Sequence, residues 1–319
     1  MYFNGKEIKK LFPKFYFFKE INECIIDGKK YIFKVCPKNN HGDYTLKYFY
    51  NDLIIKYMCN EIFINCCDID LITTNKKTGV IVPDYRKSGY NYINGKQILG
   101  EYLNYLEYNK LIEESLGINV KYPVDENQRL FLINQINNLE NIWDALNYRY
   151  RKDSENVRND KITKIMTELG KRFCFDYLVM QSDRHERNWE IEEKDDEAAL
   201  TPLYDNETSF ELGIINPEMR VEISSTKGID NELEKYLCYS SDYFKNQFLD
   251  LFSFLTPQKL EEIIEKIEFE RRFQFPYMYK ENILKNYNLN YIDISNRIQR
   301  INLQGGIKKW QTNILLLLD

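Results

Sequence analysis

The chain has 319 residues, of which 43% are hydrophobic and 29% are charged, and its formal net charge is −5. This size and composition predict a chain that buries a sizeable core, as one large α/β domain or as two lobes. Both signs of charge are mixed along the sequence, so we expect no nucleic-acid partner. We also expect no membrane span, because no run of 18 apolar residues is present, and no secretion signal, because the N-terminus lacks a charged segment followed by an apolar one.

Seven cysteines are scattered along the chain without a CxxC pair, and the only histidines are His41 and His185. This pattern argues against a zinc site, because such sites need cysteine and histidine ligands at short spacings. Free thiols in a reducing cytoplasm are the simpler interpretation.

Two antiparallel strands are predicted near the N-terminus, over residues 16–26 and 30–36. Asp27-Gly28 between them is a common hairpin turn. Lys34 lies in the second strand among apolar and aromatic neighbours, so its ammonium group points to one face of a small sheet. Without further information, such a lysine is equally well a surface residue whose charged end reaches water.

A helix is predicted over residues 43–63, and two more strands follow over 70–74 and 79–85. From Gly95 onward the apolar residues recur mainly at helical spacing. The predicted helices cover residues 98–112, 127–150, 162–180, 231–254, 257–271, 283–288 and 292–303. The chain is therefore expected to be β-rich in its first part and helical in the rest.

The most informative stretch begins where the helix before Gln181 ends. A loop with the sequence Ser-Asp-Arg-His-Glu-Arg-Asn follows. Two short strands, Trp189–Glu192 and Ala199–Tyr204, then flank an acidic turn and predict a β-hairpin.

Three oxygen-bearing side chains are expected to meet at the open end of this hairpin. Asp183 and Asn188 precede its first strand and Asp205 follows its second. Mg²⁺ is usually held by one or two carboxylates together with substrate phosphates, and phosphoryl transfer also needs a carboxylate that orients the attacking hydroxyl. In protein kinases the catalytic Asp lies five residues before a metal-binding Asn, which is the spacing here, and a second metal-binding Asp comes later in the chain.

The string Asp183-Arg184-His185-x-x-Asn188, with Pro202-Leu203-Tyr204-Asp205-Asn206-x-Thr208-Ser209 after it, resembles the HipA-like serine/threonine kinases. Within them the chain looks most like the small CtkA-type kinases. The first string is also similar to the catalytic loop of phosphatidylinositol kinases, which carry Asp-Phe-Gly where this chain has Asp-Asn-Glu. The resemblance implies an α+β, two-lobed protein-kinase-like fold, with a small β-rich lobe at 1–92 and a larger helical lobe at 93–319.

The resemblance also implies an ATP-dependent kinase that uses Mg²⁺ and transfers the γ-phosphate to a serine or threonine of a protein substrate. Asp183 would orient the hydroxyl and His185 would contact the γ-phosphate or share the role of base. Asn188 and Asp205 would hold the metal ion.

Nucleotide binding is expected in the N-terminal lobe. By the resemblance, Lys34 would bind the α- and β-phosphates, with Glu61 on the following helix as its acidic partner. The strand over residues 80–85 would lead into a hinge at 85–92 that meets adenine. One departure from the family is that no glycine precedes Gly28 in the first strands, where a glycine-rich phosphate loop is expected.

Several alternatives follow from the same residues. The scaffold also suits a small-molecule or lipid kinase, and the lack of a glycine-rich loop allows a weak pseudokinase that acts as a binding module. Serines and threonines in residues 206–228 are candidate phosphorylation sites of an activation segment. HipA-like relatives imply a bacterial toxin with an antitoxin-like or regulatory partner, whereas CtkA-type relatives imply delivery to a host cell instead of a purely cytoplasmic location.

Overall fold

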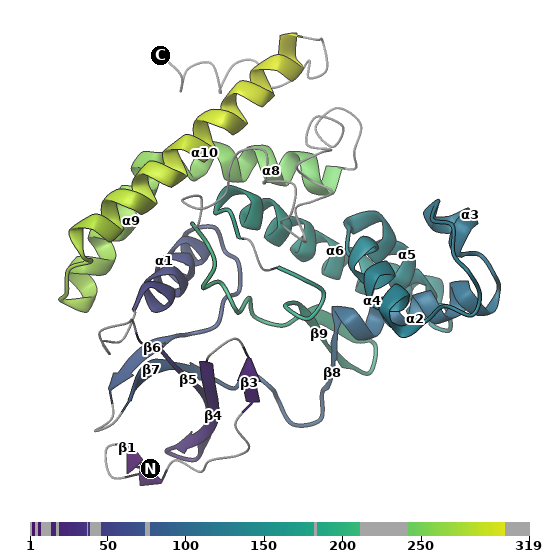
Figure 1. Ribbon diagram of the computed structural model, residues 1–319, viewed down its shortest axis with the longest axis horizontal. Coiled ribbons are helices and arrows are strands. Elements are labelled where there is room, and N and C mark those ends of the chain that lie inside the picture. The colour runs from purple at the N-terminus through teal and green to yellow at the C-terminus, as the bar shows by residue number, and fades with distance from the viewer. Residues whose placement is uncertain are drawn as a thin grey trace.

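The computed structural model describes residues 2–3, 6–7, 14–16, 19–36, 38, 46–73, 77–181, 184–210 and 242–303. Its larger sheet is built from the N-terminal part of the chain, and the helices lie mostly on the other side of the molecule (Figure 1). This is the α+β fold that the sequence predicted, a small antiparallel sheet followed by a helical region.

Five antiparallel strands form the larger sheet, in the order β3-β4-β5-β7-β6. Their bounds are Lys14–Tyr16 for β3, Lys19–Ile26 for β4, Lys29–Val35 for β5, Asp70–Thr73 for β6 and Thr78–Pro83 for β7. The turn between β4 and β5 has positive φ at both Asp27 and Gly28, +51° and +77°. These are the conformations that a two-residue hairpin turn requires, so the predicted hairpin is confirmed. Two short strands, β1 (Tyr2–Phe3) and β2 (Lys6–Glu7), pair separately.

Helix α1 (Lys47–Glu61) connects this sheet to the helical region. Leu53, Ile54, Ile55 and Met58 on it are at most 1% exposed, so apolar residues face inward around most of the helix. Figure 1 shows the reason: α1 lies between the sheet and helices α9 and α10. A helix packed on several sides carries an apolar surface on more than one face.

A second, three-stranded sheet has the order β10-β9-β8. β9 (Glu190–Lys194) and β10 (Glu197–Leu200) are the hairpin predicted from the sequence. β8 (Asn91–Asn94) comes from the predicted hinge region and pairs with β9, so that Asn94 faces Glu190. The hairpin that carries the candidate site is therefore joined directly to the connection between the two parts of the chain.

The helices after β8 have the following bounds: α2 Gly95–Tyr108, α3 Ile112–Leu116, α4 Glu126–Gln135, α5 Leu139–Arg149, α6 Glu155–Leu178, α8 Asp242–Phe254, α9 Pro257–Arg271 and α10 Tyr277–Leu303. The single helix predicted over 127–150 is wrong, because Asn138 caps a new helix by accepting a hydrogen bond from the Asn141 backbone N–H at 3.0 Å. The two short helices predicted after residue 283 are one continuous helix. Within the described residues, none of these helices is long and apolar enough to cross a membrane.

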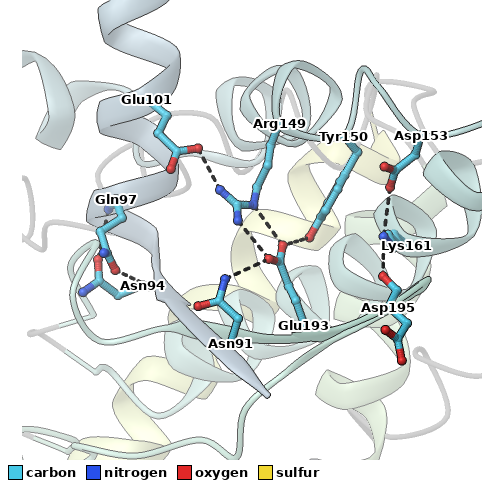
Figure 2. Close-up of polar contacts among 10 residues, drawn as sticks. All are labelled: Asn91, Asn94, Gln97, Glu101, Arg149, Tyr150, Asp153, Lys161, Glu193 and Asp195. Carbon is cyan, nitrogen blue, oxygen red and sulfur yellow. Dashed lines mark hydrogen bonds and ion pairs between the residues drawn. The ribbon is translucent and has the colours of Figure 1, made fainter. Parts of the chain in front are cut away.

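Glu193 of β9 ties the hairpin to the helical region, as Figure 2 shows. Arg149 donates to both of its carboxylate oxygens, at 2.9 and 2.8 Å, and the Tyr150 hydroxyl donates to one at 2.6 Å. Arg149 also pairs with Glu101 of α2 at 2.7 Å. Although burial raises the pKa of Glu193, the hydrogen bonds from Arg149 and Tyr150 outweigh it and lower this pKa. The contacts fix β9 against α2 and the end of α5.

Candidate active site

Lys34 of β5 and Asp205, which follows β10, form an ion pair between their side chains. The two residues are 171 positions apart in the chain. Burial alone would lower the pKa of Lys34, but the negative charges of Asp205, Glu207 and Asp52 outweigh it and raise this pKa. The lysine therefore remains charged, and the structure brings together two residues that the sequence predicted to share a site.

Asp52 of α1 is the third carboxylate near this lysine, and it is only 7% exposed. Its Oδ1 accepts a hydrogen bond from the backbone N–H of Asn206 at 3.0 Å. Burial raises the pKa of Asp52 to about 7, against the opposing effect of Lys34, while Glu207 and Asp205 raise it further. The negative charges of three acidic side chains thus act on one lysine and favour its charged form.

The structure places Glu61 away from Lys34, so the expected pairing of these two residues is wrong. The Glu61 carboxylate contacts Lys266 at 3.0 Å and Lys259 at 3.2 Å, both on α9. Glu61 lies nine residues after Asp52, which at about 100° per residue turns it to the opposite side of the helix. Asp52 is the acidic residue of α1 that faces Lys34, and its position in the middle of an apolar helix was the signal that could have identified it.

Arg184 holds together the elements around the site, and its side chain is 1% exposed. Its guanidinium pairs with Asp176 of α6 through two hydrogen bonds, at 2.9 and 3.2 Å. One of its terminal nitrogens donates to the backbone carbonyls of Asn188 at 3.1 Å and Tyr204 at 2.6 Å. The other donates to the Asn206 side chain at 2.6 Å. Because one nitrogen contacts both carbonyls, Asn188 and the residue before Asp205 are neighbours in space.

Asn188 and His185 lie in the turn that leads into β9. The Asn188 backbone N–H donates to the His185 carbonyl at 2.9 Å, and the residue is 7% exposed. His185 Nδ1 accepts a hydrogen bond from the Arg187 backbone N–H at 3.1 Å. The imidazole side chain is 24% exposed, so it is accessible from solvent.

Asp183, the predicted catalytic residue, lies outside the described residues, but the residues on both sides of the gap contact the Asp205 segment. Gln181 is fully buried, and its amide donates to the Asp205 carbonyl at 2.8 Å. Gln181 also accepts a hydrogen bond from the Thr208 hydroxyl. Arg184, on the other side of the gap, donates to the Tyr204 carbonyl.

The backbone of the Asp205 segment is itself unusual. Asp205 has φ of +55°, in the left-handed region that non-glycine residues seldom adopt. Strained conformations of this kind persist where neighbouring contacts impose them, and they cluster at functional sites. Here the contacts include the hydrogen bonds that Gln181, Asp52 and Arg184 make to residues 204–206.

The predicted hinge contacts the same hairpin. The Tyr85 hydroxyl donates to Glu190 at 2.9 Å, and Arg86 pairs with the other oxygen of this carboxylate at 3.3 Å. The Tyr85 ring stacks on that of Tyr204, with 6.1 Å between the ring centres and 20° between the planes. The stacked rings of Tyr85 and Tyr204 therefore lie next to Asp205, where the strand from the larger sheet meets the hairpin.

Trp189 fixes the other end of the turn that contains His185 and Asn188. Its indole N–H donates to Asn137 at 3.1 Å, and the ring is 1% exposed. The ring lies against Gly95, where a Cβ atom would come within 2.2 Å of indole carbon Cε2. The backbone N–H groups of Gly95 and Lys96 donate to the carbonyls of Trp189 and Glu186, at 3.0 and 2.8 Å. The start of α2 thus holds the turn in place.

The residues present fit a magnesium ion bound together with a triphosphate. Within the described part of the chain, no three His, Cys, Asp or Glu side chains gather to hold a metal ion by themselves. Asn188 and Asp205 carry an amide and a carboxylate oxygen that would serve as ligands, and Arg184 joins the segments in which they lie. Mg²⁺ is usually held by one or two protein ligands, and phosphates and water molecules complete its coordination.

The sequence predicts no glycine-rich phosphate-binding loop in the first strands, and the strand pairing shows which elements these are. In the sheet, β3 and β4 pair antiparallel directly beside β5, which carries Lys34. Their connection is residues 17–18, two phenylalanines outside the described residues. The connection between these two strands therefore contains no glycine.

Sequence reasoning missed most of the residues that support this site. The sequence motif contains Arg184 but gives it no role of its own, and it does not include Asp176. Neither Gln181 nor Asp52 was selected. Of the candidate activation-segment residues, Ser209 is buried, whereas Ser224, Ser225 and Thr226 lie outside the described residues.

Comparison with known proteins gives matches at the level of structure. No protein-family model matches the sequence, and no curated protein matches it. The structure is similar to that of CtkA, a proinflammatory kinase of Helicobacter pylori, with a TM-score of 0.56 and 15% identity over 94% of this chain and 97% of that one. It is also similar to HipA of the Shewanella oneidensis MR-1 toxin–antitoxin system, solved with HipB and operator DNA, with a TM-score of 0.50 and 14% identity over 90% of this chain and 65% of that one. The chain therefore has a HipA-like, kinase-like fold, and the predicted resemblance is confirmed at that level.

Proposed function

We propose that the chain is an ATP-dependent serine/threonine protein kinase whose cleft lies between the larger sheet and the β9–β10 hairpin. The observation that carries this proposal is the Lys34–Asp205 ion pair, held next to the Asn188 turn by the buried Arg184. In kinases a lysine on a strand of the sheet lies at the phosphates of ATP, and an aspartate that follows the catalytic loop holds the metal ion, so the two residues lie in one site. The proposal includes a boundary between two lobes at residues 92–93.

Each residue of the cleft has a distinct role in this proposal. Lys34 binds the α- and β-phosphates once Mg²⁺-ATP competes for Asp205. Asp52, whose negative charge also acts on this lysine, helps to keep the ammonium group charged. Asn188 and Asp205 would hold Mg²⁺, which when bound neutralises phosphate charge.

Asp183 and His185 would act on the transferred group. Asp183 would accept the proton of the substrate hydroxyl, and His185 would donate a hydrogen bond to a γ-phosphate oxygen. Gln181 and Arg184, on either side of residues 182–183, both contact the Asp205 segment, which supports assigning this loop and that segment to one site. Most of the rate enhancement would come from positioning and charge neutralisation.

Two properties of the similar structures belong to the proposal as well. CtkA is a proinflammatory kinase and HipA belongs to a toxin–antitoxin system. For this chain we propose a protein substrate and an antitoxin-like or regulatory protein partner. Action in the bacterial cytoplasm and delivery into a host cell are both compatible with these roles.

The test is transfer of radiolabelled phosphate from [γ-³²P]ATP with Mg²⁺ to mixed protein substrates and to the chain itself. The wild type should label serine or threonine, and Asp183→Asn should lower the rate by about 100-fold or more, as loss of a catalytic base does. Asp196→Asn, an exposed carboxylate in the β9–β10 turn, is the matched control and should keep full activity.

One alternative is favoured by a specific observation, the lack of glycine between β3 and β4. A pseudokinase would bind ATP without transferring phosphate, so ATP binding together with equal background labelling by the wild type and Asp183→Asn would replace the kinase proposal by this one. Labelling of lipids or small molecules, with proteins unlabelled, would assign the same scaffold to a different substrate class.

A further inference from the structure

Two cysteine thiols are neighbours where the end of α1 meets the connection to β6. Cys59 lies in the last turn of α1, and Cys66 follows five residues after the helix ends at Glu61. Both are free cysteines, and Cys59 is fully buried whereas Cys66 is partly exposed. Burial raises the pKa of the Cys59 thiol well above its usual value, and a hydrogen bond between this thiol and that of Cys66 raises it further. The two sulfur atoms therefore lie in contact.

Backbone hydrogen bonds fix the position of Cys66, which forms an isolated parallel bridge with Leu203. The Leu203 N–H donates to the Asn65 carbonyl at 2.7 Å, and the Cys67 N–H donates to the Leu203 carbonyl at 2.9 Å. The side-chain amide of Asn206 lies 3.9 Å from the Cys66 sulfur and donates to it. The thiol pair is therefore joined to the segment that carries the candidate metal ligand.

A buried guanidinium lies near both thiols. Arg172 of α6 is only 3% exposed, and its Nε makes no hydrogen bond among the described residues. Burial lowers the pKa of Arg172, whereas negative charge at Glu168, Cys59 and Cys66 opposes this shift. A cation beside a cysteine stabilises the thiolate, which is the form that reacts with oxidants. An incompletely bonded, buried cation thus favours negative charge at this thiol pair.

The two thiols differ as a reactive cysteine and a resolving cysteine do. Cys66 is the partly exposed member, so an oxidant that arrives from solvent meets it first. Cys59 is 0% exposed and its raised pKa keeps it a thiol, so it reacts only with a group already beside it. Cys67, the next residue along the chain, is 5% exposed, and burial raises its pKa to about 12. It provides a matched control for Cys66.

We propose that Cys66 is a site of oxidation by peroxides and that it then forms a reversible disulfide with Cys59. In the first step the Cys66 thiolate attacks one oxygen of hydrogen peroxide. An S–O bond forms, the O–O bond breaks, and the hydroxide that leaves takes up the proton released from the Cys66 thiol.

In the second step the Cys59 sulfur attacks the sulfur of the Cys66 sulfenic acid. An S–S bond forms, the S–O bond breaks, and the leaving hydroxide carries away the Cys59 thiol proton as water. The two sulfur atoms together lose two electrons, which the peroxide accepts, and a dithiol reductant reverses the change. Neither step involves phosphoryl transfer, so the proposal is tested separately from the proposed function.

The experiment treats the full chain with hydrogen peroxide and then blocks the remaining thiols with N-ethylmaleimide. Digestion after glutamate separates Cys59 from Cys66 and Cys67, because Glu61 lies between them. Mass spectrometry then identifies the linked peptides. We expect a link within one molecule that dithiothreitol removes, and that forms in the wild type and in Cys67→Ser but not in Cys66→Ser.

Two further variants test the separate roles. Cys59→Ser lacks the resolving thiol, so its Cys66 sulfenic acid should persist and react with dimedone about tenfold more than in the wild type. Arg172→Met should slow the oxidation of Cys66 by about threefold or more, because it removes the nearby cation. Lys164→Met removes an exposed cation from the same helix and should leave the rate unchanged.

The link is mapped in the wild type, so the test does not depend on the folding of any variant. The proposal is overturned if peroxide leaves Cys66 as a free thiol, if the link still forms in Cys66→Ser, or if it joins only separate molecules. Oxidation of Arg172→Met at the wild-type rate would contradict the role of the guanidinium.

Discussion

Asp176 and Arg184 form a buried ion pair with two parallel hydrogen bonds, in which each side chain is 1% exposed. The pair joins the end of α6 to the loop that carries the candidate catalytic residues. The same guanidinium also reaches the carbonyls on either side of the β9–β10 hairpin. The geometry of the proposed site thus depends on a residue that contacts no substrate.

Replacing one member of this pair should destabilise the whole fold. Arg184→Met leaves the Asp176 carboxylate buried without its partner, and we expect the free energy of unfolding to fall by roughly 3–5 kcal/mol. The double variant Arg184→Met/Asp176→Leu should cost clearly less than the sum of the single changes, because it leaves no unpaired charge. Urea unfolding of the four proteins gives these values.

The control for this cycle is the exposed pair of Lys164 and Asp160 on α6. Lys164→Met should leave the unfolding free energy nearly unchanged, because water screens such pairs. Equal costs for Lys164→Met and Arg184→Met, or simple additivity of the Arg184 and Asp176 changes, would contradict the assigned role.

Asp52 should make stability depend on pH in the absence of divalent cations. Its pKa is raised from 3.8 to about 7 in the folded chain, so the folded state holds a proton that the unfolded state releases. The stability associated with this proton is fully present below pH 3.8 and is lost as the pH rises to about 7. Asp52→Asn mimics the protonated form. The free energy of unfolding of this variant, relative to that of the wild type, should therefore increase across this window, by roughly 4 kcal/mol at most.

The measurement is urea unfolding of both proteins between pH 4 and 8, with Asp196→Asn as the exposed control. The groups that face Asp52 are Lys34, Asp205 and Glu207. A difference between Asp52→Asn and wild type that stays constant with pH would show that Asp52 is already ionised in the folded chain at low pH.

Two glycines of α2 provide a matched pair of packing variants. A Cβ atom at Gly95 would meet the Trp189 ring and the Glu186 carbonyl, at 2.2 and 2.6 Å, whereas at Gly100 it would meet nothing within 4 Å. Gly95→Ala should therefore destabilise by about 1–3 kcal/mol, and Gly100→Ala should stabilise by about 0.5–1 kcal/mol. Thermal unfolding checks both, and a Gly95→Ala protein as stable as the wild type would contradict the close packing of the tryptophan.

Lys34 and Glu61 should differ in their effect on nucleotide binding. Lys34→Met should weaken ATP binding by about tenfold or more, since it removes a charge-assisted hydrogen bond to phosphate. Glu61→Gln should change the affinity by less than about twofold, because Glu61 pairs with two lysines of α9 at the surface. Fluorescence titration with a labelled ATP analogue measures both affinities. An equal loss of affinity in the two variants would show that Glu61 contributes to nucleotide binding as much as Lys34 does.

Local patterns predicted much of the fold because their physical causes are local. The Asp27-Gly28 turn, the β9–β10 hairpin and the start of α9 after Thr256 each depend on neighbouring residues, and each is present. The break at Asn138 was missed because the apolar spacing of the two helices continues across it. A capping side chain then determines where one helix ends and the next begins.

The supporting residues of the site could not be predicted in the same way. Lys34 and Asp205 were selected because both match kinase motifs, and the structure pairs them. Whether Asp52 or Glu61 faces the lysine depends on the rotation of α1 against the sheet, which long-range packing fixes. The burial of Arg184 depends likewise on α6, which places Asp176 behind the loop.

The central claim is that Asp205 and Asn188 hold magnesium against the phosphates of ATP, and calorimetric titration with ATP in Mg²⁺ and in EDTA tests it most directly. The account predicts that the wild type and Asp196→Asn bind ATP more tightly in Mg²⁺, and that Asp205→Asn binds it equally in both. An Asp205→Asn protein that keeps the full magnesium-dependent gain in affinity would contradict the claim.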